Sequence, residues 1–308
     1  MNKIKTHPKL SLIQILGTAT ELNALNQVLE KLDPTAKNIL AGPEAYSLFA
    51  MLPPGREPCH KYLYGVYAED RLVGCLDVIR GYPEPSFAYV GLFVLEQEQR
   101  DQGFGAKLWN LAETIIGSWN EIKKWRLGVA LQNKAAERFW HRMEFLPTGE
   151  KSISHSRGFE IECALFEKPI LAQTMGHFEA TENFATAMDH EDFATAVNFI
   201  SPDCRYDFRH EEVVGREVIM KMYRDNAVWA KENLDQIDYS HGLGFSSDGC
   251  LIISYADHIT HRMNKHAHNC RQILEFQEDG LISRIRHQDL PGETDSLRDF
   301  FKKCGIKR

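Results

Sequence analysis

The chain has 308 residues, of which 43% are hydrophobic and 26% are charged, and its formal net charge at pH 7 is −7. This length predicts two domains, and the composition is typical of folded globular proteins rather than of disordered or fibrous chains. The acidic balance argues against an extended nucleic-acid surface, which needs clustered Lys and Arg. A local binding site for a small anionic ligand is compatible with this net charge.

The seven cysteines are scattered along the chain, and no two of them form a CxxC pair. This pattern indicates neither a disulfide scaffold nor a zinc ribbon, and it fits a reducing cytoplasm. The stretch Met1 to Leu16 is interrupted by charged residues and a proline, and no apolar run approaches the roughly 20 residues that span a bilayer. We therefore expect neither export nor membrane insertion.

The first half of the chain alternates helical and strand-like patterns, which predicts an α/β or α+β layer fold for residues 1–168. The expected helices cover residues 19–32, 42–49, 106–116 and 134–143. The expected strands cover residues 62–67, 72–79, 89–95 and 126–130, with closing strands near 145–149 and 159–166.

The second half, residues 177–308, follows a segment without clear periodicity at residues 169–176, where we place a linker. Its expected helices are 178–188, 191–198 and 215–232. Its expected strands are 204–208, 251–262, 266–277 and 281–290. Helices followed by long antiparallel strands are typical of an α+β domain, so the fold class is α+β with two domains.

The most informative motif is Arg100-Asp101-Gln102-Gly103-Phe104-Gly105, which stands between a predicted strand and a predicted helix. Glycine lets the backbone approach a ligand closely, and the free N–H groups of a first helical turn attract a phosphate. By itself the motif is also compatible with a tight turn that Gly103 merely permits.

Residues 1–168 resemble the GNAT superfamily of N-acetyltransferases. The resemblance rests on Arg100-x-x-Gly103-x-Gly105 after a strand, followed by Asn133-x-x-Ala136-x-x-Phe139-Trp140. It implies acetyl-CoA as co-substrate, with the pyrophosphate on the loop from Arg100 to Gly105. It also implies that Phe93 and Val94 offer backbone groups to the pantetheine arm and that Asn133 lies beside it.

The resemblance departs from the family where the chemistry occurs. Many members carry a tyrosine acid at the place of Trp140, and an indole N–H cannot supply a proton at neutral pH. Tyr89 stands where some members carry a glutamate base. The family's glycine at the end of the later helix is Glu144 here, which predicts a slightly different helix end. We expect the acceptor pocket to be lined by Asp77, Arg80, Tyr82 and Tyr89, although Asp77 and Arg80 are also compatible with a solvated strand pair.

The last strands of the second half allow an argument from parity. A two-residue turn at Asp279-Gly280 pairs Glu278 with Leu281, Leu274 with Ile285, Gln272 with His287 and Cys270 with Asp289. Paired residues share a face, and an even loop before Lys265 adds His261, His266 and His268 to it. The polar members at one end of this face are His261, His268, Cys270, Gln272, His287 and Asp289.

Polar groups at one end of an apolar face predict a lined cavity. His287 and Asp289 could form an acid/base pair in which the carboxylate raises the pKa of the imidazole. The opposite face, with Asn269, Arg271, Glu275 and Arg284 among its members, is expected to meet solvent or a second subunit. Two other interpretations stay open: a metal site from His261, His266 and His268, or histidines that are satisfied hydrogen-bonding groups at the sheet rim.

The element order of residues 177–301 is similar to the SnoaL-like branch of the nuclear transport factor 2-like fold. That resemblance implies a cone around a small-molecule cavity, homodimers through the sheet in many members, and an Asp or His in the cavity for isomerase or cyclase chemistry.

The leading hypothesis is a cytoplasmic N-acetyltransferase that uses acetyl-CoA to acetylate a small amine, with no nucleic-acid, membrane or metal partner. The second half would then bind a ligand or mediate dimerisation. The alternatives are a CoA-binding sensor without turnover, and chemistry in the cavity of the second half by His287 and Asp289.

Overall fold

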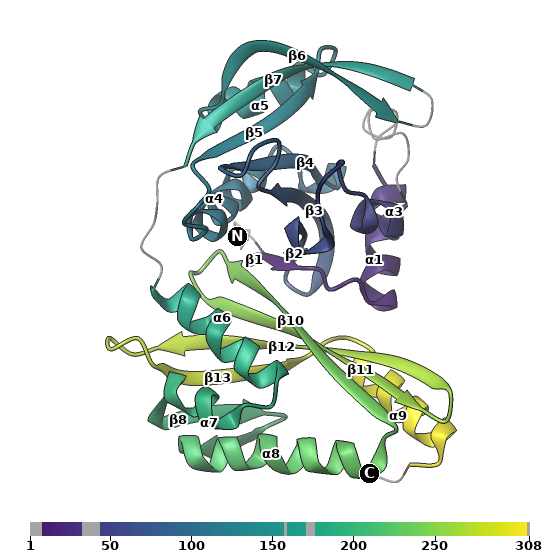
Figure 1. Cartoon of the computed structure of the whole chain (residues 1–308), viewed down its shortest axis with the longest axis vertical. Coiled ribbons are helices and arrows are strands. Elements are labelled where there is room, and N and C mark those ends of the chain that lie inside the picture. The colour runs from purple at the N-terminus through teal and green to yellow at the C-terminus, as the bar shows by residue number, and fades with distance from the viewer. Residues whose placement is uncertain (1–7, 33–43, 157–158, 171–175, 307–308) are drawn as a thin grey trace, which may run out of the picture. The chain divides into compact units, whose positions relative to one another are not determined.

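The computed structural model describes residues 8–32, 44–156, 159–170 and 176–306. Contacts divide the chain into two compact units, Met1–Thr174 and Met175–Arg308, and the division falls inside the predicted linker. Each unit has its own strands and helices (Figure 1). No helix in the described part of the chain is long and apolar enough to cross a membrane.

The first unit is a mixed sheet flanked by helices. Its strands lie in the order β6-β7-β5-β4-β3-β2-β1, and β4 and β5 are parallel while the other neighbours are antiparallel. Figure 1 places α4 on one side of these strands and α1 and α3 on the other. The strands are β1 Leu10–Gln14, β2 Lys61–Ala68, β3 Arg71–Arg80, β4 Phe87–Leu95, β5 Lys124–Ala130, β6 Leu146–Ser156 and β7 Phe159–Pro169. The helices are α1 Ala19–Glu30, α3 Ala45–Ala50, α4 Phe104–Gly117 and α5 Lys134–Arg142, with short 3₁₀ turns at Pro58–His60 and Gln97–Gln99.

Local sequence explains most of these elements. Thr18 and Glu21 form a capping box that starts α1, and the turn Glu69-Asp70 joins β2 to β3. The predicted helix 42–49 corresponds to α3, and its residues 42–43 lie outside the described residues. Between α4, α5 and the sheet lies an aromatic core whose rings include Trp109, Trp125, Trp140 and Phe145.

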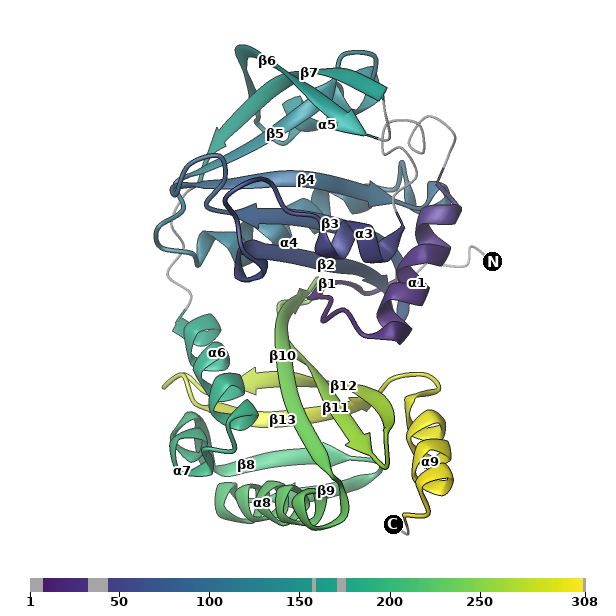
Figure 2. The ribbon, with the colours of Figure 1, turned by 45° about the vertical axis from the view of Figure 1, so that its right-hand side comes forward.

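The second unit is a curved sheet with strands in the order β10-β11-β12-β13-β8-β9. The expected antiparallel sheet is in fact mixed, because β8 pairs with β13 in parallel. Figure 2 shows α8 lying along β8 and β9, and the C-terminal part of α8 packs against α9 through Trp229 and Phe301. The strands are β8 Ile200–Phe208, β9 Glu211–Val214, β10 Gln236–Ser246, β11 Leu251–His261, β12 Asn264–Phe276 and β13 Ile282–Asp289. The helices are α6 Gly176–Asp189, α7 Phe193–Ala196, α8 Arg216–Asn233 and α9 Glu293–Cys304, with a 3₁₀ turn at Val197–Phe199.

The predicted register of β12 and β13 is confirmed between Cys270 and Leu274 and is wrong at the turn. Cys270 pairs with Asp289, Gln272 with His287 and Leu274 with Ile285. The expected pair of Glu278 and Leu281 is absent, because the backbone of Gln277 bonds to both Gly280 and Leu281 and so closes a three-residue loop. A register shift between Glu275 and Phe276 then restores the predicted pairing, so two deviations of one residue cancel.

Four elements had no sequence prediction: β1, β9, β10 and α9. The longest strand among them, β10, contains Gly242 and Gly244, which weaken its strand signal. The start of α9 has no side-chain cap, because Gly292 in the left-handed region precedes it.

Candidate functional site

An opening in the sheet of the first unit forms its candidate site. Parallel pairing of β4 with β5 starts at Phe87 with Lys124 and stops at Val90 with Leu127, although both strands continue. The two strands separate beyond that point and enclose a pocket of about 150 Å³. Its lining consists of Val90–Val94 of β4, Leu127–Ala130 of β5, and Asn133, Ala136 and Trp140.

The register of β3 and β4 decides which backbone groups face this opening. Glu96 N donates to Val73 O at 2.8 Å, and hydrogen-bonded pairs alternate along an antiparallel ladder, so Val94 bonds to Cys75 of β3. The N–H and C=O of Phe93 therefore point the other way, towards the opening. Of the two residues predicted to offer backbone groups, Phe93 has the required direction and Val94 contributes only to the pocket wall.

The glycine loop directly follows β4 and leads into α4. Gly103 precedes the helix with φ +78°, a conformation that favours glycine, and a Cβ there would meet no atom within 4 Å. Among the described residues, no side chain caps the first turn of α4, which is compatible with the predicted phosphate site at this helix start. Glycine is favoured at position 105 for a different reason, because a Cβ there would lie 3.1 Å from the side chain of Phe139 in α5.

Two side chains of the loop form hydrogen bonds with backbone carbonyls that lie just before it. Arg100 Nε donates to the carbonyl of Leu95 at 2.9 Å, and Gln102 Nε2 donates to the carbonyl of Glu98 at 2.6 Å. Asp101 adopts φ 59°, the left-handed region that Asn and Asp tolerate best after glycine. Arg100, Asp101 and Gln102 thus shape the turn, and the backbone N–H groups of Gly105 and Ala106 in the first turn of α4 are the candidate groups for binding an anion.

Asn133 lines the pocket and begins α5. Its Oδ1 accepts from Ala136 N at 3.1 Å, so its side chain is the N-cap of that helix. Trp140, about two turns later, also lines the pocket and packs edge-on against Trp109 and Phe145. The expected change at the end of this helix does not occur: Glu144 adopts φ 67°, the conformation that a glycine would have.

The predicted acceptor pocket does not form as a whole. Asp77 is 3% exposed, and its Oδ2 lies 2.8 Å from Lys61 Nζ, whose side chain is equally buried. Burial raises the pKa of Asp77, against the opposing attraction of Lys61. Asp77 also faces Gly91, a residue at the bulge of β4, where a Cβ would come within 2.6 Å of the carboxylate. Asp77 is therefore neither solvated nor open to a substrate.

Of the other residues predicted to line the acceptor pocket, Arg80 contacts side chains outside it, and Tyr82 and Tyr89 contact each other. Arg80 bonds to Glu121 and Tyr62 and lies over the ring of Trp119. Tyr82 and Tyr89 pack edge-to-face with centroids 5.3 Å apart. The hydroxyl of Tyr89 lies 3.4 Å from the place of a Cβ on Gly128, a pocket residue. Burial raises the pKa of Tyr89 to about 12, which makes it a hydrogen-bond donor and excludes a role as base.

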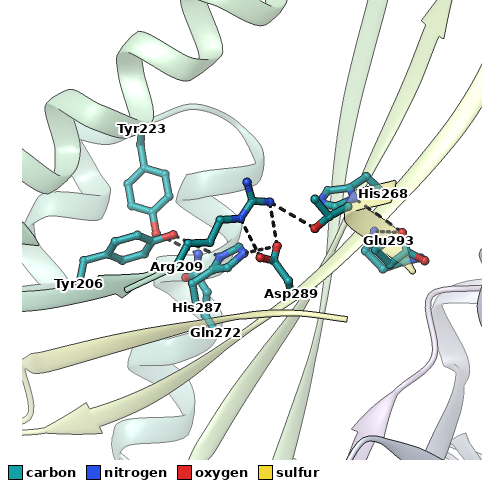
Figure 3. A network of polar contacts seen from close by, with 10 residues as sticks. Tyr206, Arg209, Tyr223, His268, Gln272, His287, Asp289 and Glu293 are labelled. Atoms are coloured by element: carbon teal, nitrogen blue, oxygen red, sulfur yellow. Dashed lines mark hydrogen bonds and ion pairs between the residues drawn. The ribbon is translucent and has the colours of Figure 1, made fainter. Parts of the chain in front are cut away.

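The second unit contains a larger cavity of about 670 Å³. His268, Cys270, Gln272, His287 and Asp289 line it, as the shared face predicted. Figure 3 shows the polar network on its wall. It includes residues from β8, α8, β12 and β13, together with Arg209 and Glu293.

The hydrogen bonds of this network have a fixed direction. Gln272 Nε2 donates to Tyr223 Oη at 2.9 Å, and Tyr206 Oη lies 3.2 Å from His287 Nδ1. The ionised Asp289 carboxylate can only accept, so the proton of neutral His287 resides on Nε2, 3.4 Å from Asp289 Oδ1. His287 Nδ1 then accepts from the Tyr206 hydroxyl, which keeps its proton because burial raises its pKa.

The expected acid/base pair of His287 and Asp289 does not form as predicted, because a third residue, Arg209, binds Asp289. Arg209 holds Asp289 with two bonds, Nε to Oδ2 at 2.7 Å and Nη2 to Oδ1 at 3.1 Å, which lower the pKa of Asp289 to about 2. Burial lowers the pKa of His287 and outweighs the opposing effect of Asp289. The net pKa of the imidazole is therefore lowered and not raised as expected, so His287 is neutral near pH 7, while Asp289 is ionised and held by Arg209.

The histidines of the predicted face do not converge as one group. His268 lines the cavity, 3.7 Å from Glu293, whereas His261 does not line it and lies 3.3 Å from Asp235. His266 stacks on Phe300. Among residues 8–32, 44–156, 159–170 and 176–306, no three His, Cys, Asp or Glu side chains are placed to hold a metal ion. On the opposite face, Asn269 is buried and bonds to Glu293 rather than to solvent.

Sequence reasoning missed Lys61, Gly91 and Arg209. Lys61 and Gly91 act through contacts with Asp77, 16 and 14 residues away along the chain, and Arg209 acts on Asp289, 80 residues away. Arg209 occupies the turn between β8 and β9, and no local pattern marks such a turn residue as the partner of a distant carboxylate.

Comparison with known proteins identifies the first unit. Residues 26–145 match the family described as Acetyltransferase (GNAT) family. No curated protein matches the chain. The protein therefore carries a GNAT acetyltransferase domain, and the co-substrate of that family is acetyl-CoA.

Solved acetyltransferase structures are similar to part of the chain. An acetyltransferase from Thermus thermophilus is 17% identical with a TM-score of 0.40, and the match covers 53% of this chain and 99% of that one. A ribosomal L7/L12 alpha-N-protein acetyltransferase in complex with coenzyme A is 16% identical with a TM-score of 0.40, covering 56% and 98%. The ribosomal-protein-S18-alanine N-acetyltransferase of Escherichia coli is 12% identical with a TM-score of 0.37, covering 54% and 96%.

Proposed function

We propose that the GNAT domain transfers an acetyl group from acetyl-CoA directly to a small amine. The observation that carries this proposal is the opening between β4 and β5. It leaves the backbone of Phe93 unpaired beside a narrow pocket and lies at the end of β4 that leads to the N-terminus of α4. A slender pantetheine arm fits such an opening by pairing with a strand edge, and the pyrophosphate fits the uncapped helix start.

In this proposal the residues of the opening have separate roles. The N–H of Phe93 donates to the thioester oxygen as negative charge develops there, and Asn133 and Trp140 form the wall beside the arm. The amine nitrogen forms the new C–N bond while the C–S bond breaks. The amine loses one proton and the thiolate gains one, so the net proton transfer is balanced.

Tyr89 is the candidate hydrogen-bond donor to the departing sulfur, which takes its own proton from water. Its hydroxyl lies next to Gly128, where the strands begin to separate, and its pKa of about 12 keeps it protonated. No base is needed on the protein if the amine binds in its neutral form with its proton passing to water. The edge-to-face rings of Tyr82 and Tyr89 offer an aromatic surface for the amine's carbon skeleton.

The first experiment tests binding. We expect acetyl-CoA at about 1 mM to raise the melting temperature, and Gly103→Asp to abolish the shift because a carboxylate then occupies the phosphate site. Gly149→Asp is the matched control, since Gly149 also has a positive φ and open space within the first unit. An unchanged melting temperature of the unaltered protein with acetyl-CoA would refute the proposal.

The second experiment tests turnover, because one observation favours a CoA-binding protein without catalysis: Trp140 replaces the expected acid and is held in the aromatic core. Thiol release from acetyl-CoA with a panel of amines distinguishes the two functions. Under the acetyltransferase proposal, Tyr89→Phe lowers kcat about tenfold or more and leaves the acetyl-CoA thermal shift intact. Binding without release with any amine would support the sensor function instead.

A further inference from the structure

The cavity of the second unit has an aromatic wall with a polar network at one end. Six of its lining rings are Tyr206, Phe208, Tyr223, Tyr239, Tyr255 and Phe301. Its volume of about 670 Å³ lies in the range of small-molecule sites. Rings of this kind bind the flat faces of a ligand through large contact areas.

The charged side chains of this wall already have partners. Asp257 has one, and the acidic and basic residues of the other pairs hold each other at hydrogen-bond distance. These pairs are Arg209 with Asp289 at 2.7 Å, Asp189 with His241 at 2.7 Å, Arg298 with Asp295 at 2.8 Å, and Glu191 with Lys231.

The two histidines of the wall add no charge at neutral pH. Burial lowers the pKa of His268 and of His287, and it outweighs the carboxylates near each of them. Arg209 retains an unused donor, because its hydrogen bonds to Asp289 and Thr294 come from Nε and Nη2 and, among the described residues, Nη1 makes none. Apart from Asp257, whose partner need not be a cation, the charged groups of the wall are thus compensated by an opposite charge, and the wall offers a hydrogen-bond donor near its polar end.

We propose that this cavity binds an uncharged, ring-bearing molecule with a carbonyl acceptor. An ionised ligand would lose its hydration and find the charges of these four pairs already engaged, whereas an uncharged ligand avoids that cost. The aromatic rings contact the apolar part of the ligand, and Arg209 Nη1 donates a hydrogen bond to the ligand's carbonyl oxygen. Arylalkyl acetamides belong to this class, and as products of the first unit they rest on the proposed function; the charge selectivity does not.

The test uses three probes with one ring and different charge: 2-phenylethylamine, its N-acetyl derivative and 3-phenylpropanoate. Calorimetric titration of the whole protein at pH 7 without acetyl-CoA measures binding only, so a failure of acetylation leaves the result untouched. We expect the acetamide to bind at least about tenfold more tightly than either charged probe. Equal or tighter binding of a charged probe, or no binding of the acetamide at millimolar concentration, overturns the proposal.

Two variants place the binding in the cavity and reverse its selectivity. Arg209→Gln leaves the Asp289 carboxylate uncompensated and should favour the amine, while Asp289→Asn leaves the guanidinium uncompensated and should favour the carboxylate. Arg284→Gln is the control, because it removes an ion pair with Asp207 of similar length outside the cavity lining. If the two cavity variants do not shift selectivity in opposite directions, the ligand does not bind in this cavity.

Discussion

The two units build their candidate sites from different parts of the chain. The first unit uses backbone: an opening between β4 and β5, a bulge at Gly91 and the uncapped start of α4. The second unit uses side chains, with paired charges and hydrogen-bonded tyrosines around a wide cavity. A backbone site depends on the geometry of the sheet that carries it, whereas a side-chain site depends on how its charges are compensated.

The largest effect is expected from Lys61→Met in the first unit. The substitution leaves Asp77 buried without its partner, which should lower the free energy of unfolding by about 3–5 kcal/mol. Urea unfolding followed by tryptophan fluorescence reports on this unit, because four of the five tryptophans lie in it.

Two controls sharpen that result. Lys151→Met removes an exposed pair with Glu162 and should change the stability by no more than about 0.5 kcal/mol. Adding Asp77→Leu to Lys61→Met should recover much of the loss, because no unpaired charge remains. A loss below about 1 kcal/mol in the single variant would show that the buried pair does not support the β4 bulge.

The next effect concerns the second unit and depends on pH. Burial disfavours the charged form of His241, but its bonds to Asp189 and Glu182 prevail and raise its pKa to about 9. A raised pKa in the folded state stabilises the protein fully below about pH 6.5 and ceases to do so as the pH rises through about 9, a loss of at most roughly 3 kcal/mol. Urea unfolding by circular dichroism between pH 6 and 10 measures it.

His241→Asn is the control for this pH dependence. The variant lacks the titrating group, so its stability should change less between pH 6.5 and 9 than that of the unaltered protein. The same slope in both proteins would mean that His241 does not compensate Asp189 in the folded state.

A smaller effect is expected from Gly91→Ala. A Cβ there would meet the Asp77 carboxylate at 2.6 Å, so the bulge must shift, at a cost of about 1–3 kcal/mol in the first unit. Gly128→Ala on the facing strand meets its nearest atoms at 3.4 Å and should have the smaller effect on stability. Comparing the two by urea unfolding tests whether the space at Gly91 is required; equal losses would contradict it.

The smallest effect is a gain. Glu144 ends α5 with φ 67°, and Glu144→Gly should remove a backbone strain of about 1 kcal/mol, partly offset by the greater entropy of glycine in the unfolded chain. The expected result is a slightly higher melting temperature with unchanged acetyl-CoA binding. A lower melting temperature would show that the 3.5 Å contact of Glu144 with Lys168 outweighs the strain.

Features within a short stretch of sequence could be predicted, and features between distant stretches could not. The glycine motif, Asn133 and the elements around them follow local rules, so their positions came from sequence. The parity argument placed Gln272, His287 and Asp289 on one face because strand alternation is strict. The same argument included His261, but sharing a face does not fix how far along the strand a cavity extends.

The amino-acid sequence by itself determined the type and order of most elements, the acetyltransferase motif and the shared polar face, because these depend on spacing of two to four residues. Tertiary structure alone decided what each polar group can do. Lys61 takes Asp77 out of reach of a substrate, Arg209 neutralises Asp289, and burial keeps His287 uncharged. Charge and protonation depend on neighbours in space, and the chain brings those neighbours together only when it folds.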